Sequence, residues 1–511
     1  MCGIAAVYSL HVDENPLDTR ALGGSILARL SHRGPDDSDD LTVGTHAWLG
    51  HTRLSIVDLD GGRQPLGGAG GWALVCNGEI YNHADIRAAL GPASFATGSD
   101  SEAALALLRT EGPTALDRLE GMWALCAAAP GGRFVAARDR LGIKPLYWAR
   151  HAGQVFFASE IGAFPAPVQA SVESFPPGFV WTPDAGLRRF AHAVPTAADS
   201  GQWADSAPES AEKATRDVLT DSVRRHLMAD VEVGVFLSGG LDSTLVAAIA
   251  AEEYAATGRR LKTFAVGTAD STDLLAARDA ADFLGTEHHE AVLDAGEVLA
   301  AVDQVVTSVE SFDASLIRSA VPNWFLSALA ARHVKAVLTG EGADELFAGY
   351  DYYHRSHAGP GELARELERT LGDLHGLNLQ RCDRVTMAHG LEARVPFLDA
   401  RVIEHAMSLP ASMKGLEPDG MEKGHLRRAF AGRLPDRLLW RRKVQFGTGS
   451  GAQGLLGDRW DTRIDDTELT AARAESGNAP RTKEELAYYR TFRRALPTVR
   501  PEAVLTRFAT A

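Results

Sequence analysis

The chain has 511 residues, more than one hydrophobic core usually serves, so two or three domains are expected. Hydrophobic residues make up 45% and charged residues 23%, as in ordinary globular proteins, and no apolar run approaches the roughly 18 residues of a membrane helix. The formal net charge of -15 disfavours sequence-independent binding to nucleic acid, which needs a Lys- and Arg-rich surface, so we expect neither membrane nor nucleic-acid partners.

Cysteine usage and the N-terminal sequence predict a cytoplasmic protein. The four cysteines, Cys2, Cys76, Cys126 and Cys382, are scattered without a CxxC pair. This spacing fits a reducing compartment better than a disulfide scaffold or a zinc site. The N-terminus has neither the basic segment nor the long apolar stretch of a signal peptide.

Residues 2–190 alternate short strand-like runs with turn signals. Apolar or β-branched runs bounded by Gly, Asp and Asn predict strands within 46–59, 72–82, 133–140 and 154–160. Helical patterns interrupt them at 21–32 and 101–112. The alternation predicts a first domain of layered sheets flanked by helices.

A linker and a change of pattern follow. Residues 191–212 are rich in Ala, Ser, Pro and Asp and break the periodicity, which predicts an interdomain linker. Further along, strand-like runs begin at 231, 261 and 333, and each leads into a helical stretch. Strands that alternate with helices predict a parallel, doubly wound sheet in a second domain at 213–511, whose remainder is mostly helical.

The most specific motif of the second domain is LSGGLDST, at Leu237–Thr244. A strand that ends in two glycines lets main-chain N–H groups surround an anion, and the N-terminus of the next helix adds partial positive charge. The motif lacks the Gly-Lys-Ser/Thr ending of a Walker A loop. Because Gly-rich turns are common without any ligand, the phosphate interpretation depends on Asp242, whose carboxylate would repel a phosphate unless Mg²⁺ lay between them.

A second acidic turn, TGEGADE at Thr339–Glu345, also ends an apolar strand. Both loops are therefore expected at the carboxyl edge of one sheet, where doubly wound folds bind ligands. Two such loops together predict a site for a nucleotide with Mg²⁺.

With SGGLDS followed by GEGADE, the second domain resembles the pyrophosphate-loop ATP pyrophosphatases, which cleave ATP between the α and β phosphates and adenylate a substrate. The further runs TFAVG, HGLEARVPFLD and WRRKVQFG are similar to the synthetase domain of glutamine-hydrolysing asparagine synthetases. The resemblance implies ATP contacts from the strand ends and the loops that follow them, namely Leu237, Ser238, Gly239, Gly240, Asp242, Ser243, Val266, Thr339 and Gly340.

The same resemblance implies roles for charged residues of the domain. Asp242 and Asp344 would bind Mg²⁺, and Lys443 would neutralise charge on the phosphates. Glu341 would be a candidate base toward incoming ammonia, while Arg394 would stabilise the loop architecture. In isolation, Arg394 and Lys443 would more often be solvated or ion-paired surface residues, so these roles depend on their motifs.

The N-terminal sequence MCGIAAVYS places a cysteine directly after the initiator methionine. Methionine before a small residue is normally excised, which would leave Cys2 with a free α-amine beside its thiol. The reference pKa of an α-amine is about 7.7, so this amine can act as a general base at neutral pH. A buried strand cysteine is the simpler alternative for any single Cys.

The motifs that accompany Cys2 favour the catalytic interpretation. HRGPDD, HTRLSIVD, CNGEIYN and TGSDSE follow in order, and with CGI they resemble the class II glutamine amidotransferases, a branch of the N-terminal nucleophile hydrolases. The resemblance implies that Asn77 and Gly78 form the oxyanion hole, where the loss of one donor costs roughly 10²–10³ in rate. Arg53 would pair with the glutamine α-carboxylate. The rest of the implied glutamine pocket is Val57, Asn77, Gly78, Glu79 and Asp100.

Together these features predict an α+β N-terminal nucleophile hydrolase sandwich (αββα), followed by an α/β doubly wound parallel-sheet synthetase domain with a helical C-terminal part. Glutamine would be hydrolysed in the first domain, and ammonia would pass internally to a carboxylate activated by ATP with Mg²⁺. Fusing the two sites keeps ammonia unprotonated and away from water. The expected partners are L-glutamine, L-aspartate or another carboxylate, and ATP, with a homodimer as the candidate assembly.

The acceptor acid is the point where the motifs depart from the family. Asparagine synthetases commonly continue the lysine motif as KEQFSDG, whereas this chain reads KVQFGTG and lacks an acid at Val444 and at Thr448. Ala343 and Leu316 also stand where polar residues are frequent, and unpaired polar contacts are what discriminate small acids. Aspartate is the first choice, and an amidotransferase of the same mechanism acting on another carboxylate is the alternative. A nitrogen-sensing or storage protein without turnover is disfavoured by the complete motifs of both domains.

Overall fold

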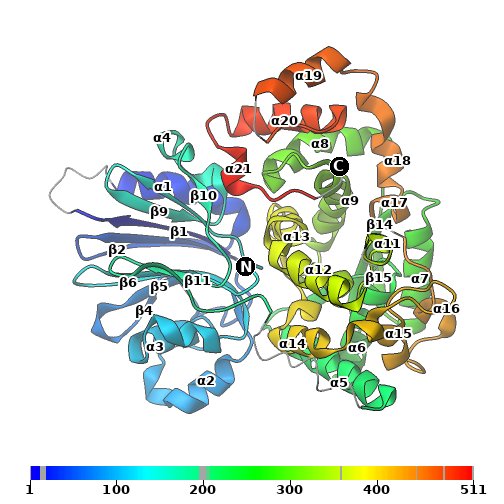
Figure 1. The fold of residues 1–511 in the computed structure, drawn as a ribbon. Coiled ribbons are helices and arrows are strands. Elements are labelled where there is room, and N and C mark those ends of the chain that lie inside the picture. The colour runs from blue at the N-terminus through cyan, green and yellow to red at the C-terminus, as the bar shows by residue number, and fades with distance from the viewer. Residues whose placement is uncertain are drawn as a thin grey trace.

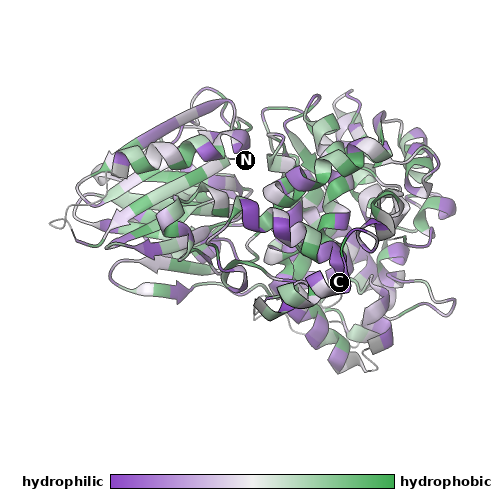
Figure 2. Cartoon of the chain, turned by 90° about the horizontal axis from the view of Figure 1, so that it is seen from above, coloured by the Kyte–Doolittle hydropathy of each residue, from purple (hydrophilic) through white to green (hydrophobic). Residues whose placement is uncertain are grey.

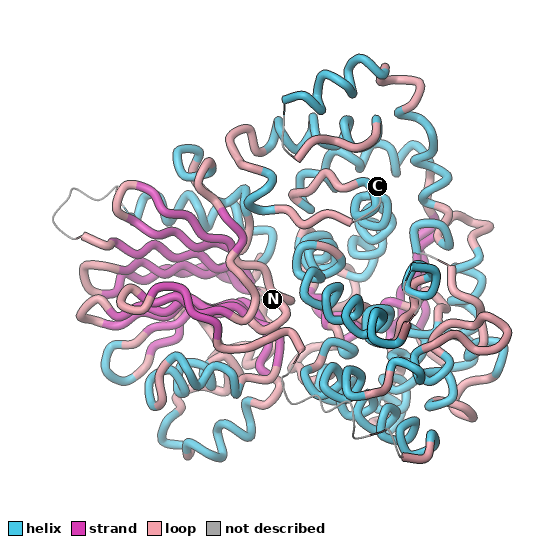
Figure 3. Tube along the Cα trace, viewed as in Figure 1, coloured by secondary structure: helices cyan, strands magenta, loops and turns pink. Residues whose placement is uncertain are grey.

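The fold was obtained as a computed structural model, which describes residues 2–11, 19–194, 203, 206–356, 359–444, 446–475 and 478–508. Figure 1 and Figure 2 show two bodies side by side, a β-rich N-terminal domain and a larger, helix-rich domain. In Figure 3 the start of the chain lies on the face of the N-terminal domain that is turned toward the second domain. The N-terminal strand therefore begins at the boundary between the domains.

Two antiparallel sheets form the N-terminal domain. The first has the order β10-β8-β9-β1-β3-β2, with bounds β1 (Cys2–Ser9), β2 (Asp37–Val43), β3 (Ala47–Arg53), β8 (Tyr147–His151), β9 (Gln154–Ala158) and β10 (Glu173–Ser174). The second has the order β12-β11-β7-β6-β5-β4, with bounds β4 (Leu66–Gly67), β5 (Ala73–Ile80), β6 (Gly121–Ala129), β7 (Arg133–Arg138), β11 (Phe179–Thr182) and β12 (Gly186–Arg189).

Strand β1 is buried along its whole length because both of its faces have partners. Ile4 and Ala6 belong to a hydrophobic cluster shared with the second sheet, whereas Ala5 and Val7 belong to a cluster that includes helix α1. This alternation is the period of a strand covered on both faces. The outer helices are α1 (Thr19–Leu30) on the first sheet and α2 (His83–Leu90) and α3 (Glu102–Thr110) on the second, with a short α4 (Ala166–Gln169) near β8. The predicted αββα sandwich is confirmed.

The second domain is built on a parallel sheet with the order β15-β14-β13-β16-β17. The bounds are β13 (Val233–Phe236), β14 (Lys262–Gly267), β15 (Glu287–Val292), β16 (Ala336–Leu338) and β17 (Glu392–Arg394). The order reverses between β13 and β16, and such a topological switch point is where doubly wound sheets bind ligands. The predicted parallel sheet is confirmed, and both motif loops leave it at this point.

Helices cover both faces of the parallel sheet. Val235 and Leu338 contact one hydrophobic cluster, and Phe236 and Val337 contact another, as expected for strands buried on both faces. The first cluster includes residues of α5 (Pro208–His226), α6 (Leu241–Ala256), α7 (Thr272–Leu284) and α14 (Ala400–Ser408). The second includes residues of α8 (Ala295–Val309), α9 (Ala314–Ala330) and α13 (Asn378–Met387).

The C-terminal part is mostly helical, as the sequence predicts. Its further helices are α10 (Ala343–Leu346), α11 (Asp351–Ser356), α12 (Pro360–Asp373), α15 (Gly424–Ala429), α16 (Asp436–Leu439), α17 (Phe446–Gly449), α18 (Ala452–Leu456), α19 (Asp466–Glu475), α20 (Lys483–Ala495) and α21 (Pro501–Val504). No helix of the described segments is long and apolar enough to cross a membrane.

The predicted linker falls largely outside the described residues. Positions 195–202, 204 and 205 are not described, and α5 begins at Pro208, within the segment predicted as linker. The predicted strand at 46–59 is shorter in the structure. Strand β3 ends at Arg53, and Asp58 in the following loop has a left-handed φ of 50°, which no strand accommodates.

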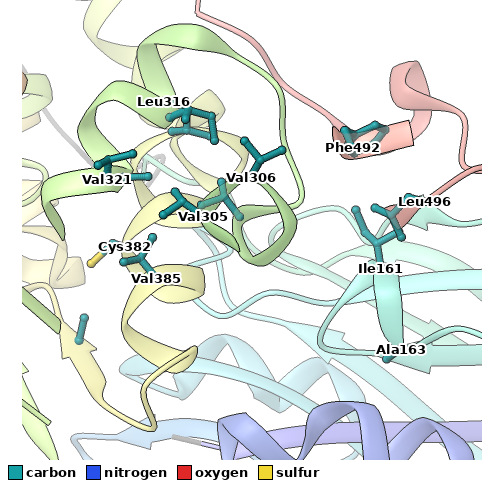
Figure 4. Close-up of a cluster of buried hydrophobic side chains, with 14 of the residues drawn as sticks. Ile161, Ala163, Val305, Val306, Leu316, Val321, Cys382, Val385, Phe492 and Leu496 are labelled. Atoms are coloured by element: carbon teal, nitrogen blue, oxygen red, sulfur yellow. The ribbon is translucent and has the colours of Figure 1, made fainter. Parts of the chain in front are cut away.

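One hydrophobic cluster crosses the boundary between the domains. Figure 4 shows Ile161 of the N-terminal domain beside Leu496, which follows α20, with Phe492 of the same helix nearby. Phe492 is 1% exposed, and its ring centroid lies 5.4 Å from that of Phe312. The C-terminal helices are therefore part of the core that the two domains share.

Truncation of Phe492 should destabilise the whole chain. We expect Phe492→Ala to lower the free energy of unfolding by about 3–5 kcal/mol, because it removes a buried aromatic ring and leaves a cavity. Phe283→Ala on α7 is the control, since Phe283 is 48% exposed and its loss should cost less than about 0.5 kcal/mol. Urea unfolding followed by circular dichroism measures both values, and equal effects would contradict the shared core.

Candidate active sites

Cys2 is the first residue of β1 and pairs in register with Arg53 of β3. It is only 8% exposed, and burial raises the pKa of its thiol. A protonated thiol needs a base before it can act as a nucleophile. The α-amine that excision of the initiator methionine would create on the same residue is a base within reach, although Met1 itself lies outside the described residues.

Asn77 of β5 joins the second sheet to Cys2. The main-chain N–H of Cys2 donates a hydrogen bond to Asn77 Oδ1 at 3.0 Å. The Nδ2 of Asn77 is buried and has no hydrogen-bond partner among the described residues. An unpaired buried amide on a side chain that contacts the main chain of Cys2 is suited to stabilise an oxyanion, because burying a donor without a partner is costly until that charge forms. Gly78 follows Asn77 and pairs in register with Trp123, so its main chain is fixed by β6.

Arg53 fixes the loop that follows β3, a role that the sequence does not predict. Its guanidinium donates hydrogen bonds to the carbonyl oxygens of Leu59 at 3.0 Å, Asp58 at 2.7 Å and Val57 at 3.3 Å. Arginine has five N–H donors, so these three bonds leave donors for a carboxylate. Arg53 thus holds the Val57 loop in place, and its proposed contact with glutamine stays a prediction.

The two predicted acidic residues of this pocket have different partners. Asp100 Oδ2 accepts a hydrogen bond from the main-chain N–H of Ile80 at 2.7 Å, at the end of β5. Glu79 Oε1 lies 3.4 Å from Arg394 Nη2, which belongs to the second domain. Arg394 also donates to the carbonyl oxygen of His226, so its contacts fit the architectural role expected of it. Burial raises the pKa of Asp100 to about 6, and burial together with the nearby carboxylate of Glu392 raises the pKa of Glu79 well above its usual range.

The loss of charge on Asp100 should weaken glutamine binding in acid. Because the pKa of Asp100 is raised to about 6, its carboxylate is charged above that pH and protonated below it, whereas the glutamine α-ammonium stays charged. In a Cys2→Ala background, which prevents hydrolysis, we expect the glutamine Kd measured by calorimetry to be constant at pH 7–8 and to rise about tenfold per pH unit below pH 6.

Two variants test that assignment. Asp100→Asn should bind glutamine weakly with no dependence on pH, while Asp85→Asn, at an exposed position of α2, should behave as the parent protein. A pH dependence that persists in Asp100→Asn would assign the titration to another group.

In the second domain the two motif loops touch each other. A Cβ atom placed on Gly340 would lie 2.9 Å from Asp242 Cβ and 2.9 Å from the main-chain nitrogen of Ser243, which real Cβ atoms do not tolerate. The two loops are therefore so close at Gly340 that no residue with a side chain fits there. Thr339, which precedes Gly340, is fixed by a hydrogen bond from its N–H to the carbonyl oxygen of Arg394 on β17.

The first loop leaves the N-terminus of α6 open. The N-cap residue Gly240 has no side chain to cap this 16-residue helix. Ser243 Oγ accepts a hydrogen bond from the N–H of Ser238 at 3.2 Å and donates to the carbonyl oxygen of Gly240, which closes the loop around Gly239. Uncapped N–H groups at a helix N-terminus bind phosphate. The side chain of Leu237 is buried in one of the hydrophobic clusters that cover the parallel sheet, and that of Val266 is buried in the other. Only the main-chain atoms of these two residues therefore face the carboxyl edge of the sheet, where ATP is expected.

The predicted metal ligands lie together and are joined by lysines. Lys423 forms ion pairs with Asp242 and with Asp344, and Lys443 pairs with Asp344 and lies over the ring of Tyr350. Burial raises the pKa of Asp242, whereas Lys423 and Lys443 outweigh the effect of burial on Asp344 and lower its pKa. The Oδ1 atom of Asp242 is buried without a hydrogen-bond partner in the described chain, and carboxylate oxygens are the ligands that Mg²⁺ prefers. No group of three or more His, Cys, Asp or Glu side chains in the described part of the chain could hold a metal ion. The two aspartates therefore fit a magnesium ion that the phosphates of a nucleotide would also hold.

Glu341 is held by a cation from a distant helix. Its carboxylate is paired with Arg381 of α13, and burial raises its pKa above the usual value. A carboxylate with a raised pKa is a suitable proton acceptor for ammonia, provided that Arg381 can release it. Glu341 lies in a recognisable motif, whereas nothing in the local sequence marks Arg381 as its partner.

Three further residues of the two sites have no signal in the sequence that marks their roles. Arg33 Nε donates to the carbonyl oxygen of Cys2 at 3.1 Å, and its Nη1 lies 2.9 Å from Asp383 Oδ2 on α13. Lys423 lies between the candidate metal ligands. Arg33 belongs to the HRGPDD motif, but its partner Asp383 is 350 positions away. Nothing in the local sequence marks Asp383 or Lys423.

Separation of the two motif loops should impair the ATP-dependent reaction and leave glutamine hydrolysis intact. We expect Gly340→Ala to reduce ATP-dependent pyrophosphate release by about 100-fold, since a displacement of about 1 Å at a reacting centre has that effect. Glutamine hydrolysis in the other domain should be unchanged. Gly372→Ala on α12, where a Cβ atom meets no neighbour, is the control and should affect neither reaction. Parallel assays of pyrophosphate and glutamate measure both, and an equal loss of the two activities in Gly340→Ala would contradict a local effect.

Comparison with known proteins matches both domains. The glutamine amidotransferase domain family model matches residues 1–176, and the asparagine synthase family model matches residues 214–364 and 355–506. The chain is 38% identical to the glutamine-hydrolysing asparagine synthetase B of Escherichia coli (strain K12), over 97% of this chain and 92% of that protein. It is also 38% identical to glutamine-hydrolysing asparagine synthetase 3 of Arabidopsis thaliana, over 96% and 86%.

A third relative is the glutamine-hydrolysing asparagine synthetase of Zea mays, which is 36% identical over 97% of this chain and 86% of its own length. These identities extend through both domains rather than through one motif region. The chain therefore belongs to the family of glutamine-hydrolysing asparagine synthetases.

Proposed function

We propose that this protein converts L-aspartate to L-asparagine, with glutamine as the nitrogen donor and with ATP cleaved to AMP and pyrophosphate. The observation that carries the proposal is the contact of Cys2 N–H with Asn77 Oδ1, on a side chain whose buried Nδ2 has no hydrogen-bond partner among the described residues. Membership of the family, with both domains matched, supports the same reaction.

The first half-reaction takes place at Cys2. The α-amine accepts the thiol proton, and the sulfur attacks the side-chain amide carbon of glutamine. The resulting oxyanion is stabilised by Asn77 Nδ2 and the N–H of Gly78. Return of the proton to the leaving nitrogen releases ammonia and leaves a thioester, which water hydrolyses to glutamate. Asp100 supports the orientation of glutamine by attracting its α-ammonium group.

The second half-reaction takes place at the edge of the parallel sheet. The N-terminus of α6 and the N–H groups of its loop bind phosphates, while the aspartate side-chain carboxylate attacks the α-phosphorus and expels pyrophosphate. Ammonia then attacks the acyl carbon, Glu341 accepts a proton, and AMP leaves. Asp242 and Asp344 would hold Mg²⁺, which neutralises charge on the phosphates. Lys443 contributes a further positive charge on that side.

We also propose the setting in which the protein works. The described cysteines, Cys2, Cys76, Cys126 and Cys382, are buried and free, which supports a reducing compartment such as the cytoplasm. A homodimer is the proposed assembly, and light scattering of the purified chain tests it. The domain boundaries at 2–190 and 213–511 are part of this proposal.

The reaction is tested by its dependence on aspartate. With ATP, Mg²⁺ and glutamine, we expect pyrophosphate release only when L-aspartate is added, with asparagine formed in equal amount by mass spectrometry. Cys2→Ala is the matched control. It should lose synthesis from glutamine and retain synthesis from added ammonium chloride, because the second site is intact.

Two outcomes would argue against the proposal. Amide formation from a different carboxylic acid, but not from aspartate, would establish the alternative acceptor that the departures at Val444 and Thr448 raise. Loss of ammonia-dependent synthesis in Cys2→Ala, with the fold intact, would contradict the separation into two sites.

A further inference from the structure

Lys423, which belongs to neither of the two motif loops, lies between the candidate metal ligands Asp242 and Asp344. Lys423 directly precedes α15, and its Nζ is 2.5 Å from Asp242 Oδ2 and 2.5 Å from Asp344 Oδ1. The residue is 2% exposed. One buried ammonium is thus shared by carboxylates from the two motif loops, in the place where a cation would join them.

The surrounding fold is adapted to this position of the ammonium. Lys423 has a left-handed backbone conformation, with φ of 58°, which a residue with a side chain keeps only when its surroundings impose it. A Cβ atom on Gly349 would lie 2.1 Å from Lys423 Cε and 2.0 Å from Asp344 Oδ1, so glycine is required there to admit both groups. Strained conformations of this kind cluster at functional sites.

The carboxylates nearest Lys423 are already paired with cations. Lys423 pairs with Asp242 and Asp344, Lys443 pairs with Asp344, and Arg381 pairs with Glu341. The neighbouring carboxylate of Glu345 instead accepts hydrogen bonds from Tyr350 and Asn378. A divalent cation that entered alone would meet carboxylates already neutralised at close range, and would be repelled by the ammonium groups.

We propose that Lys423 stands in for the divalent cation between Asp242 and Asp344 while no nucleotide is bound, so that the metal binds only together with ATP. The inference rests on the proposed role of these two aspartates as metal ligands. The phosphates of ATP offer the ammonium an alternative anion, which frees the carboxylates for the metal. Lys423 is then a positioning residue that makes metal binding depend on nucleotide binding.

The test is metal binding without turnover, measured by electron paramagnetic resonance of free Mn²⁺, which takes the same oxygen ligands as Mg²⁺. The wild-type chain should bind Mn²⁺ tightly only when α,β-methylene-ATP, which resists cleavage between the α and β phosphates, is present. Lys423→Met should bind Mn²⁺ without nucleotide at least about tenfold more tightly than wild type, because two buried carboxylates lose their shared cation.

Control variants separate this effect from damage to the fold. Lys423→Arg keeps the charge and should retain the dependence on nucleotide. Lys262→Met removes a lysine that pairs with Glu232 at the amino end of β14, opposite to the end where the motif loops lie, and should match wild type. Glutamine hydrolysis at Cys2 reports that each variant is folded. If Lys423 only held the two loops together, its removal would leave the Mn²⁺ affinity without nucleotide unchanged or would weaken it.

The possible results separate the role of Lys423 from the proposed role of Asp242 and Asp344 as metal ligands. Equal Mn²⁺ affinity of wild type and Lys423→Met in the absence of nucleotide would overturn the role of Lys423. Tight Mn²⁺ binding by the wild-type chain alone would overturn it without recourse to any variant. Absence of Mn²⁺ binding even with the nucleotide analogue would instead remove Asp242 and Asp344 as metal ligands, and the inference with them.

Discussion

Charges buried between the two domains must be paired, and helix α13 supplies their partners. Arg384 of α13 is fully buried and contacts Glu160 of the N-terminal domain and Glu310 of the second. Asp383, the preceding residue, accepts two hydrogen bonds from the guanidinium of Arg33. The removal of one member of such a pair leaves an uncompensated buried charge, which is strongly destabilising. The domains are therefore held in one arrangement by ionic contacts as well as by the hydrophobic cluster around Ile161 and Phe492.

Helix α13 also contacts residues of both candidate sites. Arg33 binds the carbonyl oxygen of Cys2 while it pairs with Asp383, and two residues earlier Arg381 pairs with Glu341 at the nucleotide loop. Successive side chains of a helix point in different directions, so one short segment can contact both domains. Cys2, the proposed nucleophile, and Glu341, the proposed proton acceptor, are thus both positioned through neighbouring residues of α13.

The sequence predicts the parts of this arrangement that are local. Cys2 at the N-terminus, the Asn-Gly pair within β5 and the two acidic loops after β13 and β16 can each be recognised within a few residues. The βα pattern predicts that both loops lie at the carboxyl edge of one parallel sheet, whereas the order of its strands comes from the structure. The contact of Asn77 with Cys2 could be expected from the family motifs, but its unpaired Nδ2 appears only in the structure. The strand predicted at 46–59 is longer than β3 because Leu54 and Ile56 continue the apolar alternation beyond Arg53, where β3 ends.

Long-range charge pairs could not be predicted in this way. Lys423 is 181 positions from Asp242, and Arg33 is 350 positions from Asp383. In the sequence these residues are ordinary charged positions, which are usually solvated. Only the fold shows that they are buried and paired.

The central claim is that two sites in one chain form a single reaction path, and isotope transfer tests it most directly. Asparagine is synthesised from glutamine labelled with ¹⁵N in its amide, in the presence of a large excess of unlabelled ammonium, at a pH where ammonium supports little synthesis on its own. Internal transfer predicts asparagine with the same ¹⁵N enrichment as the glutamine amide. Asparagine whose label is diluted to that of the ammonium pool would mean that ammonia leaves the protein between the two sites, and would contradict the account.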